Sequence, residues 1–362
     1  MTLVLDDSLF DDPARLADVD NRGLLRHAAL AGAQVRAATE TATEVGLDDL
    51  AEGRPRALVL IARPGIALGV CRLLAALAGP RCPVPVVISD AAPAWVGALD
   101  VVFAHSDDGG DQALAESVSV ACRRGATVVL PMADDGPVAA AGAGRARLLP
   151  PRIPVPPELS FAHVFAAGLN VVNALGLVRA DTEALADELD HEAERAHPNH
   201  EPLVNPAKTL ALRLADRSPL LWGLDPVATA VAEHGAYALG CHAGVPCDVS
   251  AYQQAVTRRA LHRAAAALGS EADLFADPDE AVGALLRVFL VSARYDAASE
   301  AHERAATRDL PGADLITPGE SVRDDAVLRS AVLAARFDLA AVYLGLAAGT
   351  LNGPGWPALA MH

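Results

Sequence analysis

Four short apolar runs recur between residues 57 and 132, and each is followed by a polar turn and then by a helical pattern. The runs are ALVLIA at 57–62, PVPVVIS at 83–89, LDVVFAH at 99–105 and ATVVLPM at 126–132. Their hydrophobicity is continuous rather than alternating, which is typical of strands covered on both faces. Between the last two, DQALAESVSVACRR has its apolar residues at helical spacing. The pattern predicts an α/β unit built on a parallel, doubly wound sheet.

A second unit of the same kind is predicted further along the chain. The proline-rich link LLPPRIPVPP at 148–157 leads to a helix from Phe161 to about Leu177, and the mixed charge of 181–201 favours a solvent-facing helix. The later elements are a strand SPLLWG at 218–223, a helix PVATAVAEHGAYAL, a strand LLRVFLVSA at 285–293 and a long helix from Asp324 to Leu351. Two such units in tandem suggest an internal repeat, although the halves share no visible sequence identity.

These patterns divide the chain into four parts. Residues 1–55 form an N-terminal strand or extension followed by a helix, LLRHAALAGAQVRAA. The first α/β domain covers 56–180, a linker helix covers 181–204, and the second domain with its C-terminal helix covers 205–362.

Composition narrows the class of protein. The 362 residues suffice for two domains, and 52% of them are hydrophobic. A formal net charge of −17 argues against nucleic acid as a partner, because such binding depends on Lys and Arg. We expect no membrane span, signal peptide or nucleotide cofactor, since no apolar run reaches about 18 residues and no G-x-G-x-x-G follows a strand. The five cysteines lack CxxC spacing, which favours reduced thiols in the cytoplasm.

The turn in VVFAHSDDGGDQAL at 101–114 combines a strand end, glycines and a helix start. That arrangement usually attracts phosphate, because free backbone N–H groups point outward at a helix N-terminus. Here the turn carries Asp107, Asp108 and Asp111. The carboxylates are interpreted first as helix caps that take the place of a phosphate. A site for a cation, metal or amino sugar, and phosphosugar binding through backbone N–H groups and Arg63, stay open.

Several segments resemble a known family. NPAK at 205–208 with the following ALRLADRSPLLWG resembles the domain junction of the two-domain phosphoglucose/phosphomannose isomerases. LVLIARPGIAL and PVPVVISDAAPAWVGALD are similar to that family's first strands, and FDLAAVYLGLAAGTLNGPGWP resembles its final helix. The resemblance runs from about residue 57 to 357. It implies two sugar-isomerase (SIS) domains, each a flavodoxin-like αβα sandwich, in a homodimeric phosphosugar isomerase of mannose metabolism.

The site motifs of that family are altered in this chain. The family's phosphate loop, Ser-x-Ser-Gly-Asn-Thr, has His105, Asp107 and Gly110 at its hydroxyl positions, and the Gly-x-Gly-Gly-Ser loop reads ARPGI at 62–66. The resemblance places a sugar or sugar-phosphate ligand at eight residues. They are Arg63, Gly65, His105, Ser106, Asp107, Asp108, Gly109 and Gly110.

The catalytic motifs are altered as well. The family's Glu-Asn-Ala-Lys is replaced by CHAG at 241–244, so Cys241 and His242 are the catalytic candidates by position. The alternative is an ordinary loop with the cysteine packed inward. No Pro-Glu-x-x-His-Asn-Glu is present, and the family's Pro-Arg matches either Pro151-Arg152 or Pro157-Glu158.

A histidine cluster gives the remaining ligand-like pattern. His191, His197 and His200 lie near Glu194 and Glu201, but their spacing matches no usual metal site and a charged linker explains them. We therefore expect no metal.

Three functions remain. The first is a SIS protein of this family that binds a carbohydrate derivative with lost or altered catalysis. The second is an active aldose–ketose isomerase with His242, His105 or Glu233 as base. The third is a non-enzymatic, dimeric assembly or regulatory protein.

Overall fold

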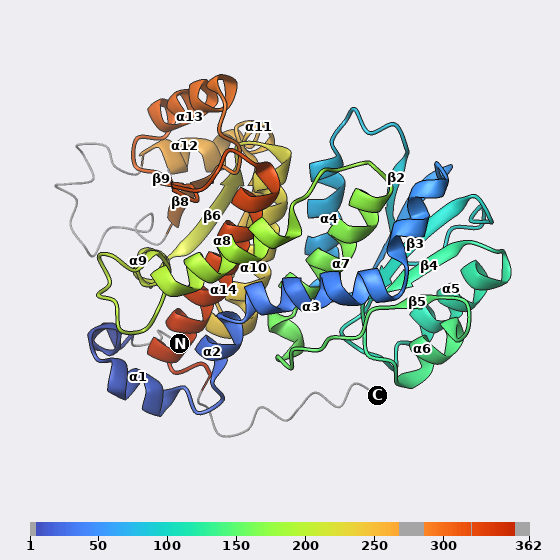
Figure 1. The fold of residues 1–362 in the computed structure, drawn as a ribbon. Helices are drawn as coiled ribbons and strands as arrows, with labels where there is room; N and C mark the ends of the chain where they lie inside the picture. The colour runs from blue at the N-terminus through green and yellow to red at the C-terminus, as the bar shows by residue number, and fades with distance from the viewer. Residues whose placement is uncertain (1–4, 268–285, 320, 352–362) are drawn as a thin grey trace. The chain divides into compact units, whose positions relative to one another are not determined.

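The computed structural model describes residues 5–267, 286–319 and 321–351. The chain forms two compact units. The first, here called unit A, comprises Leu30–His191 with Glu320–Val332. The second, unit B, comprises Met1–Ala29, Glu192–Gly319 and Leu333–His362. Each unit contains a parallel sheet flanked by helices (Figure 1), which confirms the predicted α/β class.

The sheet of unit A has the strand order β2-β1-β3-β4-β5, and all its pairs are parallel. Its strands are β1 (Ala57–Ala62), β2 (Val86–Ser89), β3 (Asp100–His105), β4 (Thr127–Leu130) and β5 (Arg147–Leu148). The four apolar runs of the sequence form β1 to β4. The fifth strand follows no apolar run and was not predicted.

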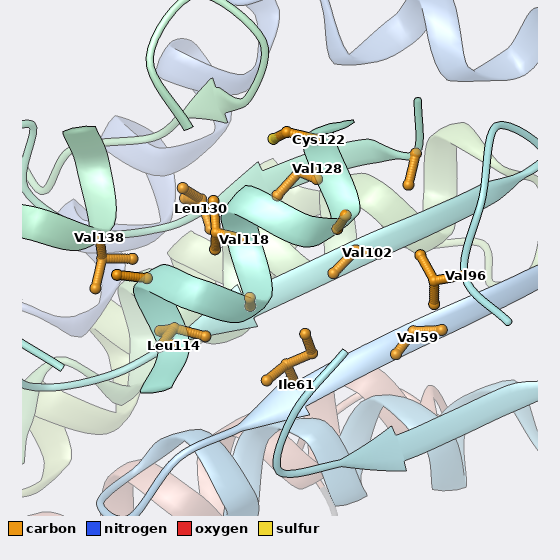
Figure 2. Close-up of a cluster of buried hydrophobic side chains, with 14 of the residues drawn as sticks. Val59, Ile61, Val96, Val102, Leu114, Val118, Cys122, Val128, Leu130 and Val138 are labelled. Atoms are coloured by element: carbon orange, nitrogen blue, oxygen red, sulfur yellow. The ribbon is translucent and has the colours of Figure 1, made fainter. Parts of the chain in front are cut away.

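Helices lie on both faces of this sheet (Figure 1). The helices of unit A are α3 (Ala31–Glu44), α4 (Ala67–Ala78), α5 (Gln112–Arg123), α6 (Gly136–Gly142) and α7 (Phe161–Ala174), with 3₁₀ segments at Leu47–Glu52 and Pro157–Leu159. Figure 2 shows the core between the sheet and α5. Side chains such as Val59 and Val102 point from the strands toward Leu114 and Val118 of α5. Neighbouring residues such as Leu58 point to the opposite face and are equally buried.

The sheet of unit B has the order β7-β6-β8-β9, again parallel throughout. Its strands are β6 (Ser218–Gly223), β7 (Asp248–Ala251), β8 (Leu286–Val291) and β9 (Asp314–Ile316). The helices and 3₁₀ segment that begin in unit B are η1 (Asp7–Asp11), α1 (Pro13–Val19), α2 (Leu24–Ala28), α9 (Pro206–Leu214), α10 (Pro226–Ala243), α11 (Tyr252–Ala255), α12 (Arg259–Ala267) and α13 (Ala297–Asp309). Residues of α11, α12 and α13 pack on Leu220 and Trp222 of β6.

Two further helices contain residues of both units: α8 (Thr182–Arg195) and α14 (Ala326–Ala347). Within the described ranges, α14 is the helix that is long and apolar enough to cross a membrane, yet all of its most apolar window is buried inside the protein. It is therefore a core helix.

The two sheets repeat one topology. In each, the first strand lies between the second and the third, so the order reverses between β1 and β3 in unit A and between β6 and β8 in unit B. Open α/β sheets bind ligands at this reversal, beyond the carboxyl ends of the two strands. The repeat expected from the sequence is present as topology, and it defines two switch points where a site can form.

Two element predictions need correction. The segment 181–201 was expected to face solvent, but Leu185, Ala186 and Leu189 of α8 are buried, and Glu192 is 0% exposed. For the N-terminus, the structure has helical segments and no strand among residues 5–55, and residues 1–4 lie outside the described part.

Candidate functional site

The switch point of unit A brings together the eight predicted ligand-binding residues. Arg63 and Gly65 follow β1, and residues 105–110 form the end of β3 and the turn after it. β1 and β3 are paired in register, with Ala62 beside His105, so the two loops leave the sheet side by side. The turn then enters α5 at Gln112.

Asp107 crosses from the second loop to the first. Its Oδ2 accepts the backbone N–H of Ile66 at 3.3 Å. Ile66 is the N-cap of α4, and its own side chain supplies no capping bond. Gly65 has φ +116°, and a Cβ built there would lie 1.9 Å from Asp107 Oδ2. Glycine therefore provides both the backbone conformation and the space for the carboxylate. A carboxylate occupies the N-terminus of α4, where an anion would otherwise be favoured.

Asp111 caps the N-terminus of α5 in the same way. Its Oδ1 accepts the N–H of Leu114 at 2.9 Å, which makes it the N-cap that the sequence predicts. Its Oδ2 accepts from Arg63 Nε at 2.6 Å. Burial raises the pKa of Asp111, but the bonds from Arg63 and Leu114 outweigh it and the pKa is lowered from the usual value. The one cation among the predicted ligand residues is thus engaged by a carboxylate of the same site.

Other bonds lie within the turn and beside it. Asp108 Oδ1 accepts the N–H of Gly110 at 2.7 Å, and the Asp108 N–H donates to Ser106 Oγ at 3.2 Å. The carbonyl of Gly109 accepts the N–H of Val138 at 3.3 Å. Each of the three aspartates of the turn therefore accepts at least one backbone N–H, and the amides at Ile66, Gly110 and Leu114 are occupied by the protein itself.

His105 lies at the base of the site and is 6% exposed. Its Nδ1 is 2.7 Å from the carbonyl oxygen of Pro131, and its Nε2 is 3.1 Å from Asp107 Oδ1. A second histidine, His163 of α7, lies close enough to interact with it electrostatically. Burial and the charge of His105 together lower the pKa of His163 to about 4. His163 was not predicted as a site residue, because its position within an apolar helix indicates core packing.

The switch point of unit B has a related arrangement. Asp225 caps α10 by accepting the N–H groups of Val227 and Ala228, and its Oδ2 accepts the N–H of Ala293 after β8 at 3.3 Å. Arg294 Nε lies 3.8 Å from Asp225 Oδ1. A carboxylate therefore links the loops of the two central strands in both units: Asp107 through the Ile66 N–H and Asp225 through the Ala293 N–H. Neither Asp225 nor Arg294 was predicted from the sequence as a site residue.

The catalytic candidates Cys241 and His242 lie on α10, not in a loop as the alternative reading had it. Cys241 is exposed, whereas His242 is 2% exposed. Adjacent helical residues point about 100° apart, so the thiol and the imidazole face different surroundings. Their assignment as catalytic residues stays a prediction.

The histidine-rich segment forms a local turn. His200 Nδ1 is 3.2 Å from the carbonyl oxygen of Arg195, and the N–H of Asn199 donates to His197 Nδ1 at 3.2 Å. Within residues 5–267, 286–319 and 321–351, no group of three or more His, Cys, Asp or Glu side chains is arranged to hold a metal ion.

Comparisons with known proteins identify the fold. No family profile and no curated protein matches the chain. Among solved structures, it is similar to a protein from Silicibacter pomeroyi DSS-3 assigned to the phosphosugar isomerases, with 17% identity over 89% of this chain and 96% of that one, and a TM-score of 0.62. It is also similar to tagatose-6-phosphate ketose/aldose isomerase from Escherichia coli, with 12% identity, coverage of 89% and 92%, and a TM-score of 0.61.

A third match is the C-terminal domain of glucosamine-fructose-6-phosphate aminotransferase from Francisella tularensis, with 9% identity, coverage of 90% and 96%, and a TM-score of 0.60. These likenesses cover nearly the whole of each chain. They show that the chain has the SIS fold of the phosphosugar isomerases, as the sequence resemblance implied.

Proposed function

We propose that this protein binds a carbohydrate derivative through its SIS fold and does not interconvert aldose and ketose phosphates. The observation that carries the proposal is Asp107. Its carboxylate contacts the amide at the N-terminus of α4, and Gly65 leaves room for it. A phosphate group placed there would have to displace an aspartate of the same sign.

The charges around Asp107 also disfavour the binding of a phosphate group. Asp107, Asp108 and Asp111 carry three carboxylates, and Arg63 is already paired with Asp111 at 2.6 Å. Two unit charges of like sign about 4 Å apart repel by about 4 kcal/mol at an effective dielectric constant near 20. A phosphate dianion would meet this repulsion and would also compete with aspartates for the N–H groups of Ile66, Gly110 and Leu114. The site fits an uncharged or amino-substituted sugar better than a phosphosugar.

The residues available for proton transfer also argue against isomerase activity. At the position where the resemblance places a catalytic glutamate, the chain has Cys241 and His242. His242 is 2% exposed, which leaves its ring little access to a substrate. Enediol chemistry requires a base within hydrogen-bond reach of the C1 and C2 protons. We further propose a cytoplasmic homodimer, on the strength of the family resemblance alone.

The test is a direct assay for isomerisation. The purified full chain, at high micromolar concentration, is incubated in D₂O with glucose 6-phosphate, mannose 6-phosphate or fructose 6-phosphate, and exchange of the C2 or C1 proton is followed by ¹H NMR. We expect no exchange above the rate without protein, whereas an active phosphoglucose isomerase serves as the positive control. Enzyme-dependent exchange that His105→Asn, His242→Asn or Glu233→Gln abolishes would replace this proposal by the active-isomerase alternative.

A further inference from the structure

The carboxyl end of β8 carries two polar groups that lack hydrogen-bond partners in the described part of the chain. Arg294 Nε is buried and has no acceptor among those residues. Asp225 Oδ1 lies 3.8 Å from it, which is too far for a hydrogen bond. Ser292 is 1% exposed, and its hydroxyl group bonds to none of the described residues. Buried polar groups are nearly always paired, so two unpaired ones this close in the chain require an explanation.

Both groups lie at the switch point of unit B. The strand order reverses between β6 and β8, and open α/β sheets bind ligands beyond the carboxyl ends of such strands. The backbone here is held firmly. The N–H of Ser292 donates to the Ile316 carbonyl oxygen at 3.0 Å, and the N–H of Ala293 donates to Asp225 Oδ2 at 3.3 Å. The unpaired groups therefore coincide with the place where this kind of sheet takes a ligand.

The charges at this position suit a small monoanion. The Arg294 side chain is 41% exposed, so a ligand can reach the outer N–H groups of its guanidinium. Two aspartates lie near it, Asp225 and Asp296, and they are engaged as the N-caps of α10 and α13. The N–H of Ser299 and, more weakly, the charge of Arg294 lower the pKa of Asp296. These aspartates repel a phosphate dianion more strongly than a carboxylate, which carries one charge and matches a guanidinium through two parallel N–H···O bonds.

We infer that the switch point of unit B is a binding site for a sugar acid, a carbohydrate that carries a carboxylate group. The carboxylate binds Arg294 and gives Nε the acceptor that it lacks, and a hydroxyl group of the ligand pairs with Ser292 Oγ. Tyr295 follows Arg294 and is 49% exposed, so its ring is accessible to the bound sugar. The site does not involve Asp107 or the loops of unit A, and the inference is therefore independent of the proposed function.

The first experiment tests the class of ligand. The full chain at pH 7 is titrated with D-gluconate, D-glucuronate, D-glucose, acetate and glucose 6-phosphate, with isothermal titration calorimetry as the readout. We expect saturable binding of at least one of the two sugar acids. The other three compounds should bind at least tenfold more weakly, because each lacks the carboxylate or the hydroxyl groups. No saturable binding of either sugar acid, or equal affinity for acetate or glucose 6-phosphate, would overturn the inference.

Substitutions then locate the site. Arg294→Gln should weaken sugar-acid binding at least tenfold, and Arg294→Lys should weaken it although the charge is kept, because an ammonium group cannot form the paired bonds. Arg304→Gln, which removes an exposed arginine from α13, is the matched control and should leave the affinity unchanged. Unchanged affinity in Arg294→Gln contradicts the site. An equal loss in Asp107→Ser would place the ligand in unit A, which overturns the inference and leaves the proposed function intact.

Ser292→Ala distinguishes a binding role from a structural one. Because the hydroxyl group is unpaired in the protein alone, its removal should leave the midpoint of ligand-free thermal unfolding unchanged or raise it. The same change should weaken sugar-acid binding at least threefold and reduce the increase in the midpoint that the sugar acid produces. A ligand-free Ser292→Ala that is less stable than the wild type but binds the sugar acid equally well would exclude this hydroxyl from the site.

Discussion

His163 is a buried histidine that the fold keeps neutral. Its Nε2 lies 3.1 Å from the carbonyl oxygen of Leu149, and the ring is 4% exposed. Burial lowers its pKa from 6.5 to about 4. Between pH 6.5 and about pH 4 the unfolded chain binds a proton at His163 that the folded protein does not. The contribution of the neutral His163 to the unfolding free energy is therefore fully present above pH 6.5 and decreases as the pH falls.

This predicts a specific pH dependence for His163→Gln, which can keep the hydrogen bond to Leu149 but cannot titrate. The wild type should lose about 2 kcal/mol of unfolding free energy between pH 7 and pH 5 that the variant retains. Urea unfolding at the two pH values measures the difference. The exposed His191→Gln provides the control and should follow the wild type. Parallel curves for the wild type and His163→Gln would contradict the assignment.

At the residue scale, the acidic turn was predictable from the sequence, but its contacts with other loops were not. Asp107, Asp108 and Asp111 were recognised because acidic side chains at a helix start have a local explanation. The bond from Asp107 to Ile66 depends on the pairing of β1 with β3, which brings together residues 41 positions apart. His163 reaches the site by the same kind of tertiary contact.

At the level of elements, the carboxylates at the two switch points bind the start of a helix and also connect the loops of neighbouring strands. Asp225 binds the first N–H groups of α10 and also the Ala293 N–H after β8. Asp296 caps α13 in the same way, through the N–H groups of Ala298 and Ser299, which both belong to its own helix. Comparing substitutions of Asp225 and Asp296 therefore distinguishes the effect of helix capping from the effect of the bond between the two strand loops.

We predict that Asp225→Ala destabilises the protein by about 2–3 kcal/mol and that Asp296→Ala destabilises it by less. Loss of the cap accounts for about 1 kcal/mol at Asp225, and loss of the bond between its carboxylate and the Ala293 N–H accounts for the rest. Chemical unfolding of both variants at one pH measures the difference. Equal losses would show that the contact with Ala293 contributes nothing to stability.

The elements most accurately predicted are those whose residues are buried on both faces. β1, β3, β6 and β8 are central strands, and their continuous apolar runs identify them. The edge strands β5, β7 and β9 were missed because they are short and contain no apolar run, whereas the edge strand β2 was identified by its run PVPVVIS. The buried face of α8 was missed for another reason. Glu192 there looks solvent-exposed in sequence, yet it pairs with Arg336 at 2.6 Å in the interior.

For the molecule as a whole, the most unusual compositional feature is its single lysine. Among 29 basic residues, only Lys208 is not arginine. It is 0% exposed, and its Nζ donates to the carbonyl oxygens of Phe10, Pro198 and His200 at 2.6, 2.7 and 2.8 Å. Three donors on one small ammonium group suit three converging carbonyls, whereas a planar guanidinium does not. Lys208 thus joins the N-terminal segment to the rest of unit B.

We predict that Lys208→Arg lowers the unfolding free energy by about 2–4 kcal/mol, despite keeping the charge. The larger group does not fit the buried position, and carbonyls are left without donors. Arg304→Lys, at a side chain that is 65% exposed, is the matched control and should change stability by less than about 0.5 kcal/mol. Proteolysis near Phe10 should accelerate in Lys208→Arg alone. Unchanged stability would mean that position 208 requires only a positive charge.

The whole-molecule prediction from sequence was correct for the α/β class and for the SIS fold. Order and spacing of strands specify a doubly wound sheet even where identity to known structures falls to 9–17%. The ligand could not be predicted in the same way, because it depends on which loop atoms already bind one another, and those bonds follow from tertiary structure.

The solitary lysine also gives the protein a built-in chemical reporter. An acylating reagent that targets primary amines has one side-chain target in the whole chain, and that target is enclosed in the native state. Uptake of such a label at Lys208 would therefore record, molecule by molecule, how often this part of the protein opens, with no engineered probe.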